Sequence, residues 1–233
     1  MLLFIKRQIP NLFTFLNLLS GCLALYSYTI NRFEWVFICV ALGIFFDFFD
    51  GFFARLFHVA GPLGVQLDSL ADMVTSGVVP GFVMYYLLSQ VSDNLYIPFF
   101  GFLVILASAY RLAKFNIDTR QTDSFIGLPT PANALLITSL PLVFNENLFL
   151  NEYFFNLIAM VLLTVLSAFL LNAELPLFAL KVKKLKFKGN ELQIVFVLIC
   201  ILLIGFLQIV AVPLIILFYV LLSLINNLLF HKK

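Results

Sequence analysis

The sequence predicts an all-α fold, a polytopic transmembrane helical bundle with about eight membrane-spanning helices and both termini in the cytoplasm. Three observations lead to this prediction. Hydrophobic residues make up 63% of the 233 residues and charged residues only 11%, far from the composition of soluble domains. The apolar residues gather in segments close to the roughly 20 residues that a helix needs to cross a bilayer. Basic residues recur almost only in alternate connections between these segments.

The apolar segments give the expected spans in chain order. They cover residues 12–30, 35–53, 63–88, 95–113, 131–144, 154–171, 192–208 and 212–229. The fifth is short for a complete crossing, and the last two form one apolar stretch that is too long for a single passage. We therefore expect a fold-back near Gln208 and Pro213.

The connections between the segments carry the polar residues. Those on the side opposite the termini are short turns that contain Asn and scattered acidic residues, as in ordinary solvated loops. No linker rich in Pro, Gly or Ser divides the chain. We treat residues 1–233 as a single integral membrane domain, with a first group of helices at about 10–180 and an additional C-terminal helix pair at about 192–229.

The basic residues set the expected orientation. Of the 14 Lys and Arg residues, all except Arg32 fall on the side of the two termini, and short cytoplasmic loops collect such residues. The lysine run at 181–188 fits an orientation signal that also rests on anionic lipid, or a specific phosphate site. The basic residues are too scattered for a nucleic-acid partner.

Four aspartates lie inside the second and third expected spans, where a charged side chain is costly unless it has a partner. Asp47 and Asp50 are three residues apart, and Asp68 and Asp72 are four apart, so each pair occupies one helix face. The rise of a helix places Asp47 about 12 Å from Arg55, and Asp68 and Asp72 about 9 and 15 Å from the start of their helix. All four carboxylates are expected to meet in one layer near the cytoplasmic interface.

Carboxylates packed in this way repel one another unless cations neutralise them. Oxygen-only ligands favour a hard divalent cation, Mg²⁺ or Mn²⁺. Zinc is disfavoured because His58 and His231 fall in a loop and in the terminal tail. The alternative is an ion-pair network that holds the bundle together, with Arg55 as the nearest balancing charge. The three cysteines, Cys22, Cys39 and Cys200, lie in apolar runs without paired spacing. This argues against a disulfide framework and against a zinc site built from cysteines.

Small residues surround the aspartates. Gly51 and Ala54 follow the first pair and Gly64 precedes the second. They allow a ligand to approach the helices closely, although helix packing alone also uses such residues. Their association with the carboxylates favours the ligand.

Residues 47–72 read DFFDGFFAR, then eight residues, then GVQLDSLAD. This pattern resembles the signature of the CDP-alcohol phosphotransferases, DxxDGxxAR and GxxxDxxxD at the same separation, and all eight fixed positions match. The stretches 10–17, 68–80, 111–116 and 127–132 are similar to the phosphatidylserine synthase branch of that family. The similarity covers about the first 135 residues well and the last two spans poorly.

The resemblance implies roles for particular residues. Asp47, Asp50, Asp68 and Asp72 would hold divalent cations, two in number, and Asp72 would also take the proton of the acceptor hydroxyl. The positions similar to those that grip the CDP-linked lipid are Asn11, Thr14, Gly51 and Arg55, and the neighbouring Ala54 and Gly64 complete this set.

The same resemblance implies a phospholipid-synthesising transferase, in which the 10–180 helices are catalytic. CDP-diacylglycerol and L-serine would give phosphatidylserine and CMP. The enzyme would be a homodimer among membrane lipids, in the cell inner membrane, with its active site facing the cytoplasm. For the serine pocket, Arg111 and Lys114 are candidates for its carboxylate and Glu174 for its amino group, although all three also fit simple interfacial roles.

Two other functions stay open. The same chemistry with glycerol 3-phosphate or an inositol phosphate would require a denser basic pocket than Arg111 and Lys114 supply. A cation channel or transporter would use intramembrane carboxylates as an ion path. A single layer of aspartates beside Arg55 suits a fixed site better than a path.

Overall fold

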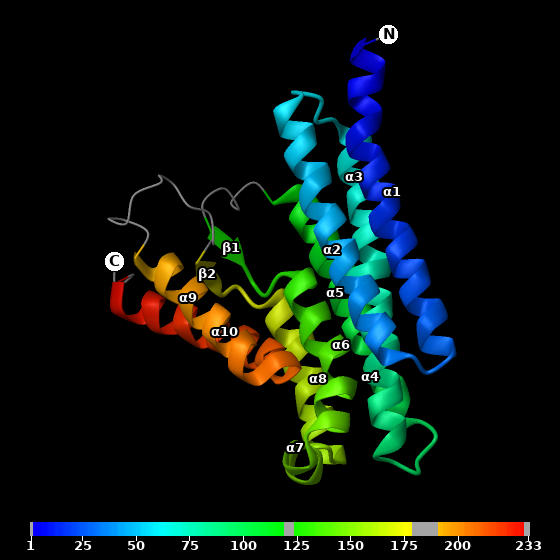
Figure 1. Cartoon of the computed structure of the whole chain (residues 1–233), viewed down its shortest axis with the longest axis vertical. Helices are drawn as coiled ribbons and strands as arrows, with labels where there is room; N and C mark the ends of the chain where they lie inside the picture. The colour runs from blue at the N-terminus through cyan, green and yellow to red at the C-terminus, as the bar shows by residue number, and fades with distance from the viewer. Residues whose placement is uncertain (1, 119–123, 179–190, 231–233) are drawn as a thin grey trace.

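The computed structural model describes residues 2–118, 124–178 and 191–230. These residues form an up-and-down helical bundle with one short two-stranded ribbon at its side (Figure 1). The ribbon is the one departure from the all-α expectation. Each of the eight expected apolar segments is helical over most of its length.

Helices α1 (Leu2–Thr29) and α2 (Phe33–Leu56) form the most extensive helix pair in the described chain. The next helical segment crosses the bundle in three parts, α3 (Pro62–Asp72), a π-helical turn (Met73–Val78) and α4 (Val79–Gln90). Pro62 suits the first turn of α3 because it has no amide hydrogen to lose. Pro80 cannot donate to the preceding turn, and a π-helical turn at that point accommodates the break.

The next helices alternate in direction along the bundle (Figure 1). A 3₁₀ turn (Ile97–Phe102) leads into α5 (Leu103–Ile117). Helix α6 (Thr130–Glu146) bends by 115° into the short α7 (Leu148–Phe154), and α8 (Leu157–Asn172) follows. The side chains of Asn147 and Asn156 cap α7 and α8 by accepting backbone amide hydrogens.

Strands β1 (Ser124–Ile126) and β2 (Pro176–Phe178) pair antiparallel, with Phe125 opposite Leu177. They join the connection after α5 to the connection after α8. The sequence did not predict this ribbon because each strand has only three residues, too few for a recognisable alternating pattern.

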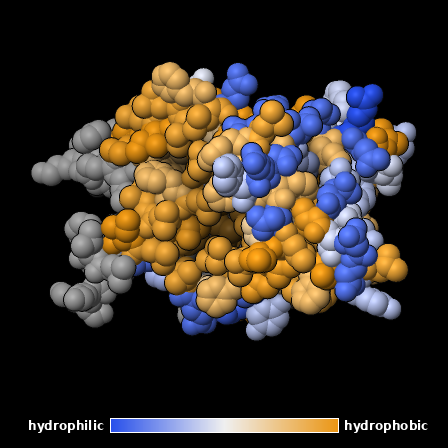
Figure 2. Space-filling model, turned by 90° about the horizontal axis from the view of Figure 1, so that it is seen from below, coloured by the Kyte–Doolittle hydropathy of each residue, from blue (hydrophilic) through white to orange (hydrophobic). Residues whose placement is uncertain are grey.

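Helices α9 (Glu191–Leu207) and α10 (Ala211–Phe230) form a C-terminal hairpin. The chain reverses at a 3₁₀ turn (Gln208–Val210), where Gln208 adopts a positive φ of 49°. This confirms the fold-back expected near Gln208. The hairpin lies at a large angle to the other helices (Figure 1). Viewed from the α7 end, the surface on the hairpin side of the molecule is almost wholly apolar (Figure 2).

Five helical segments among the described residues are long and apolar enough to cross a membrane, or six if the bent α6 and α7 form one span. Helix α8 is apolar but has only 16 residues, and most of the hairpin counts as a single apolar segment, Gln193–Ile225. The count of eight spans therefore stays a prediction. The lysine run at 181–188 lies outside the described residues, as do Arg120, His231, Lys232 and Lys233.

The buried apolar residues form two cores. The larger core joins α1, α2, α4 and α6 and includes Val40, Met84 and Ile137. The smaller core packs the hairpin against α6 and the ribbon, through residues that include Leu128 and Tyr219. The four aspartates belong to neither core, so the bundle keeps a polar region between α2 and α3.

Candidate active site

The aspartates of α2 and α3 converge as the sequence predicts. One carboxylate oxygen each of Asp47, Asp50 and Asp68 lies within 4.8 Å of the other two. Asp72, one helical turn beyond Asp68, lines the same cavity as these three. The spacing of three and four residues on two adjacent helices is therefore sufficient to gather the carboxyl groups.

The cluster fits a divalent cation. Its donors are all oxygens, and Oδ1 of Asp68 is buried without a hydrogen-bond partner. Oxygens bound to one Mg²⁺ ion at about 2.1 Å lie up to about 4 Å apart, and the 4.8 Å limit on the separations in this cluster is compatible with a shared ion after a small adjustment of the side chains. Within the described residues no Lys or Arg nitrogen lies within 4.0 Å of these carboxylates. This argues against an ion-pair network with Arg55.

Helix α1 contributes two polar contacts to the aspartates. The hydroxyl of Thr14 donates to Oδ2 of Asp50 at 2.8 Å, and Nδ2 of Asn17 donates to Oδ1 of Asp72 at 3.0 Å. The sequence pattern alone assigns no role to Asn17. The available signal was its position, a polar residue three after Thr14 on the same face of an apolar helix.

A cavity of about 380 Å³ lies between α1, α2 and the start of α3. Its lining contains the whole set expected to grip the CDP-linked lipid: Asn11, Thr14, Gly51, Ala54, Arg55 and Gly64. A Cβ atom added at Gly64 would meet no protein atom within 4 Å, and one added at Gly51 would lie 3.3 Å from Nη1 of Arg55. We call this space cavity one.

A second cavity of about 410 Å³, cavity two, adjoins cavity one. The two share Asp50, Gly51, Arg55 and Asp68. The remaining lining of cavity two comes from α2, α3, α5 and the start of α6, and includes Asp47, Asp72, Ser69, Arg111 and Thr130. The aspartate cluster therefore stands between two spaces, each large enough for part of a substrate.

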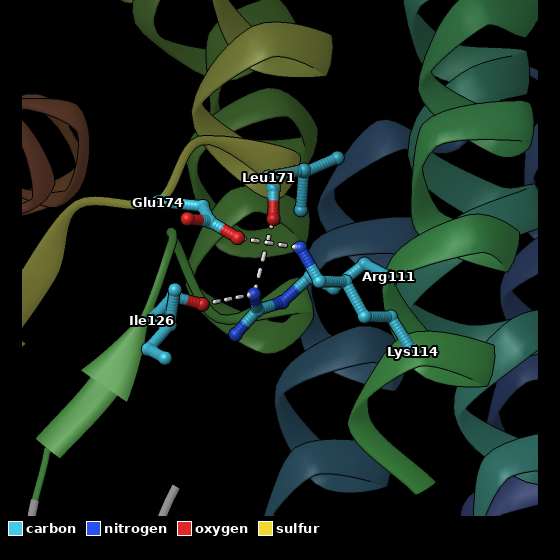
Figure 3. A network of polar contacts seen from close by, with 5 residues as sticks. All are labelled: Arg111, Lys114, Ile126, Leu171 and Glu174. Atoms are coloured by element: carbon cyan, nitrogen blue, oxygen red, sulfur yellow. Dashed lines mark hydrogen bonds and ion pairs between the residues drawn. The ribbon is translucent and has the colours of Figure 1, made fainter. Parts of the chain in front are cut away.

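The three acceptor candidates lie close together in two sets of polar contacts (Figure 3). Only one of them, Arg111, lines cavity two. Arg111 lines the cavity with 7% of its surface exposed, and its Nη1 donates to the carbonyl oxygens of Ile126 at 2.8 Å and Leu171 at 3.0 Å. Lys114 and Glu174 form an ion pair of 3.3 Å and are not part of the cavity lining.

Arg111 also lies beside a turn that requires glycine. Gly127 has a positive φ of 76°, and a Cβ atom there would come within 2.8 Å of the Leu171 carbonyl oxygen and 3.1 Å of Nη1 of Arg111. Only glycine fits this close approach without strain. Arg111 and Gly127 together hold the chain that leads into Thr130, at the wall of cavity two.

Comparison with known proteins agrees with this geometry. A family model described as CDP-alcohol phosphatidyltransferase matches residues 7–171. The chain is 35% identical over 144 residues to the CDP-diacylglycerol–serine O-phosphatidyltransferase of Bacillus subtilis, covering 60% of this chain and 78% of that protein. It is 33% identical over 153 residues to the enzyme of that name from Methanocaldococcus jannaschii, covering 66% and 67%. The match to the Helicobacter pylori (strain J99) enzyme, 34% identical over 143 residues, covers 60% of each chain.

Proposed function

The chain belongs to the CDP-alcohol phosphatidyltransferase family, and we propose that it transfers the phosphatidyl group of CDP-diacylglycerol to L-serine, which gives phosphatidylserine and CMP. The observation that carries the proposal is the aspartate cluster at the boundary of two cavities. Two substrates can approach one set of carboxylates from two sides. The names of the relatives support serine as the acceptor.

Asp47, Asp50, Asp68 and Asp72 would hold divalent cations, Mg²⁺ or Mn²⁺ and two in number, which supply charge neutralisation for a diphosphate and its leaving group when bound. The converging oxygens of the first three support this assignment. In the proposed site the chain itself fixes the carboxylates on two helices, so that little rearrangement is needed for binding.

Cavity one would seat the cytidine diphosphate. Arg55 suits the phosphate oxygens because its planar guanidinium can form two parallel hydrogen bonds. The glycines at 51 and 64 allow the ligand to lie close to the helix backbones. Asn11, Thr14 and Ala54 complete the proposed binding surface.

Cavity two would seat serine, with Asp72 as general base. A serine hydroxyl is too weak an acid to ionise alone near neutral pH, so a carboxylate must accept its proton. The hydroxyl oxygen then forms a bond to the phosphorus that carries diacylglycerol, the bond from that phosphorus to the CMP oxygen breaks, and CMP leaves. Arg111 would bind the serine carboxylate, while Lys114 and Glu174 would act from the edge of the site.

We also propose that the protein is a multi-pass protein of the cell inner membrane and a homodimer, with eight spans, both termini in the cytoplasm and the site facing the cytoplasm. The five or six candidate spans support membrane insertion. The orientation rests on the basic residues: Arg55 and Lys114 end α2 and α5, and Arg32 lies in the turn before α2.

The deciding experiment measures CMP release from CDP-diacylglycerol by the purified protein with serine, glycerol 3-phosphate and an inositol phosphate in parallel. We expect release with serine, and none from an Asp72→Asn variant that remains folded in the membrane. Release with glycerol 3-phosphate instead would replace the acceptor but keep the chemistry. Cation flux without any CMP release would favour the transporter alternative.

A further inference from the structure

We propose that Asn17 is a positioning residue that holds the carboxyl group of Asp72 in one orientation, so that one oxygen is kept available for the acceptor hydroxyl. The inference rests on the proposed function in one respect, the role of Asp72 as general base. It gives α1, whose Asn11 and Thr14 already line cavity one, a contact with the proposed general base as well.

The contact between the two residues is direct and buried. Nδ2 of Asn17 donates to Oδ1 of Asp72 at 3.0 Å, and the Asn17 side chain is fully shielded from solvent. A hydrogen bond to a carboxylate is stronger than one between neutral groups, and more so where water is excluded. Because the bond engages only one oxygen of Asp72, the other remains for proton transfer in cavity two.

Packing between helices alone does not explain an asparagine at position 17. Its Oδ1 is buried without a hydrogen-bond partner, although Nδ2 is used. An unsatisfied buried acceptor destabilises the fold, and a leucine, which has the same number of side-chain heavy atoms, has no such acceptor. The amide is therefore explained by what its Nδ2 group holds rather than by the stability of the bundle.

The helices around Asn17 are closely packed. A Cβ atom at Gly43 of α2 would lie 2.9 Å from Oδ1 of Asn17 and 2.6 Å from Cγ2 of Thr75. A Cβ atom at Gly21 of α1 would lie 2.5 Å from the Thr75 hydroxyl oxygen. The two glycines thus allow α1, α2 and the π-helical turn to close on Asn17.

Asn17 is attached to the helical segment of Asp72 at two points. Its side chain binds Asp72, and its carbonyl oxygen accepts a hydrogen bond of 3.0 Å from the hydroxyl of Thr75. Thr75 belongs to the π-helical turn that begins directly after Asp72. The second bond fixes the distance between α1 and this turn, and the first then fixes the carboxyl group.

The test compares Asn17→Leu with the wild type in CMP release, with separate kcat and KM values for CDP-diacylglycerol and the acceptor. Removal of a residue that orients a reacting group is expected to lower kcat by about 10- to 100-fold. The KM for CDP-diacylglycerol should change less than about threefold, because Asn17 is not part of the lining of cavity one. The melting temperature in detergent should fall only modestly, because the loss of the donor to Oδ1 of Asp72 is partly offset by the removal of the unpaired Oδ1 of Asn17.

Asn133→Leu is the matched control. Asn133 is also fully buried with one unpaired amide atom, Nδ2, but it lies on α6 outside both cavities. Its replacement should leave kcat unaltered. Should Asn17→Leu fail to fold, Asn17→Ser provides a second variant, whose shorter side chain does not reach Asp72 and should show the same loss of kcat.

An unchanged kcat in both Asn17 variants would overturn the proposal, as would a raised KM for either substrate with normal kcat. The assay uses whichever of the three acceptors supports release by the wild type. A wild type that prefers glycerol 3-phosphate corrects the acceptor alone, and the Asn17 comparison proceeds with it. A wild type that releases no CMP with any acceptor overturns the proposed function and this inference together.

Discussion

The hydroxyl oxygen of Thr14 lies 2.8 Å from Oδ2 of Asp50, and both side chains are at least 94% buried. The first helix therefore contacts the aspartate cluster directly as well as lining cavity one. A hydroxyl that donates to a buried carboxylate stabilises its charged form and fixes its orientation. Thr14 thus links the expected CDP-binding wall to the expected metal site.

Replacement of Thr14 by Val should weaken metal binding more than it destabilises the fold. The variant keeps the shape of the side chain but removes the donor to Asp50, and loss of such a supporting contact typically costs about 10- to 100-fold in metal affinity. We expect a corresponding rise in the Mg²⁺ concentration at half-maximal CMP release. Thr14→Ser keeps the donor and should stay near the wild type. Equal Mg²⁺ dependence of the Val and Ser variants would contradict the role of the bond.

Gly64→Ala should impair the lipid substrate without affecting the fold. A Cβ atom at Gly64 meets no protein atom, so any loss must come from a ligand in cavity one. One extra carbon in a binding surface costs about 1–3 kcal/mol, which corresponds to a KM for CDP-diacylglycerol raised about fivefold or more. Gly205→Ala on α9 is the control, since a Cβ atom there also meets nothing and lies outside both cavities. Equal KM values in the two variants would place the nucleotide elsewhere.

The sequence predicted the aspartate cluster because spacings of three and four on a helix translate directly into a shared face. Asp47 and Asp68 then meet wherever α2 and α3 run side by side. The six residues predicted to bind the CDP-linked lipid all line cavity one, since they lie near the turn between these two helices and on the adjoining part of α1, while their binding role stays a prediction.

Helical spacing does not predict which residues from distant segments come into contact. The pairing of Lys114 with Glu174 joins residues 60 positions apart, and the Asn17 bond to Asp72 joins residues 55 apart. Their spacing in the sequence carries no information on these contacts, which depend on how the helices pack. The same holds for the ribbon that places Ile126 beside Arg111.

A charge swap separates the two roles open to Lys114. The pair with Glu174 is partly exposed, at 30% and 66%, and exposed pairs contribute about 0–1 kcal/mol to stability. If Lys114 only anchors the helix, Lys114→Glu combined with Glu174→Lys should restore the KM for serine that either single change alters. If Lys114 attracts the serine carboxylate, the double variant should keep a raised KM. Steady-state kinetics with varied serine distinguishes the outcomes.

Metal removal should abolish activity and lower stability. Chelation with EDTA leaves the converging carboxylates of Asp47, Asp50 and Asp68 without a counter-charge, and Mn²⁺ at 100 times its dissociation constant should add about 2.7 kcal/mol to the free energy of unfolding. Asp68→Asn should lose most of the rise in melting temperature on Mn²⁺ addition, whereas Asp93→Asn, in an exposed turn, should retain it. A rise of the same size in both variants would place the bound cation away from the cluster.

The C-terminal hairpin should influence cavity two through Leu128. This residue is 1% exposed, packs with Phe196 and Tyr219 of the hairpin, and precedes Pro129 and Thr130 at the cavity wall. Truncation of a buried leucine costs about 2–5 kcal/mol because the site collapses only partly. Leu128→Ala should therefore lower the free energy of unfolding by about this amount, and the loosened wall should raise the KM for the acceptor more than that for CDP-diacylglycerol.

Leu221→Ala on α10 provides the comparison, since its side chain is 57% exposed on the apolar surface of the hairpin and should affect neither quantity strongly. Unfolding in detergent and steady-state kinetics on both variants test the coupling. Because the family match ends at residue 171, such a coupling would mean that the last two helices, outside the matched region, tune the acceptor side of a shared catalytic core. A Leu128→Ala variant with lowered stability but an unaltered acceptor KM would restrict the hairpin to a structural role.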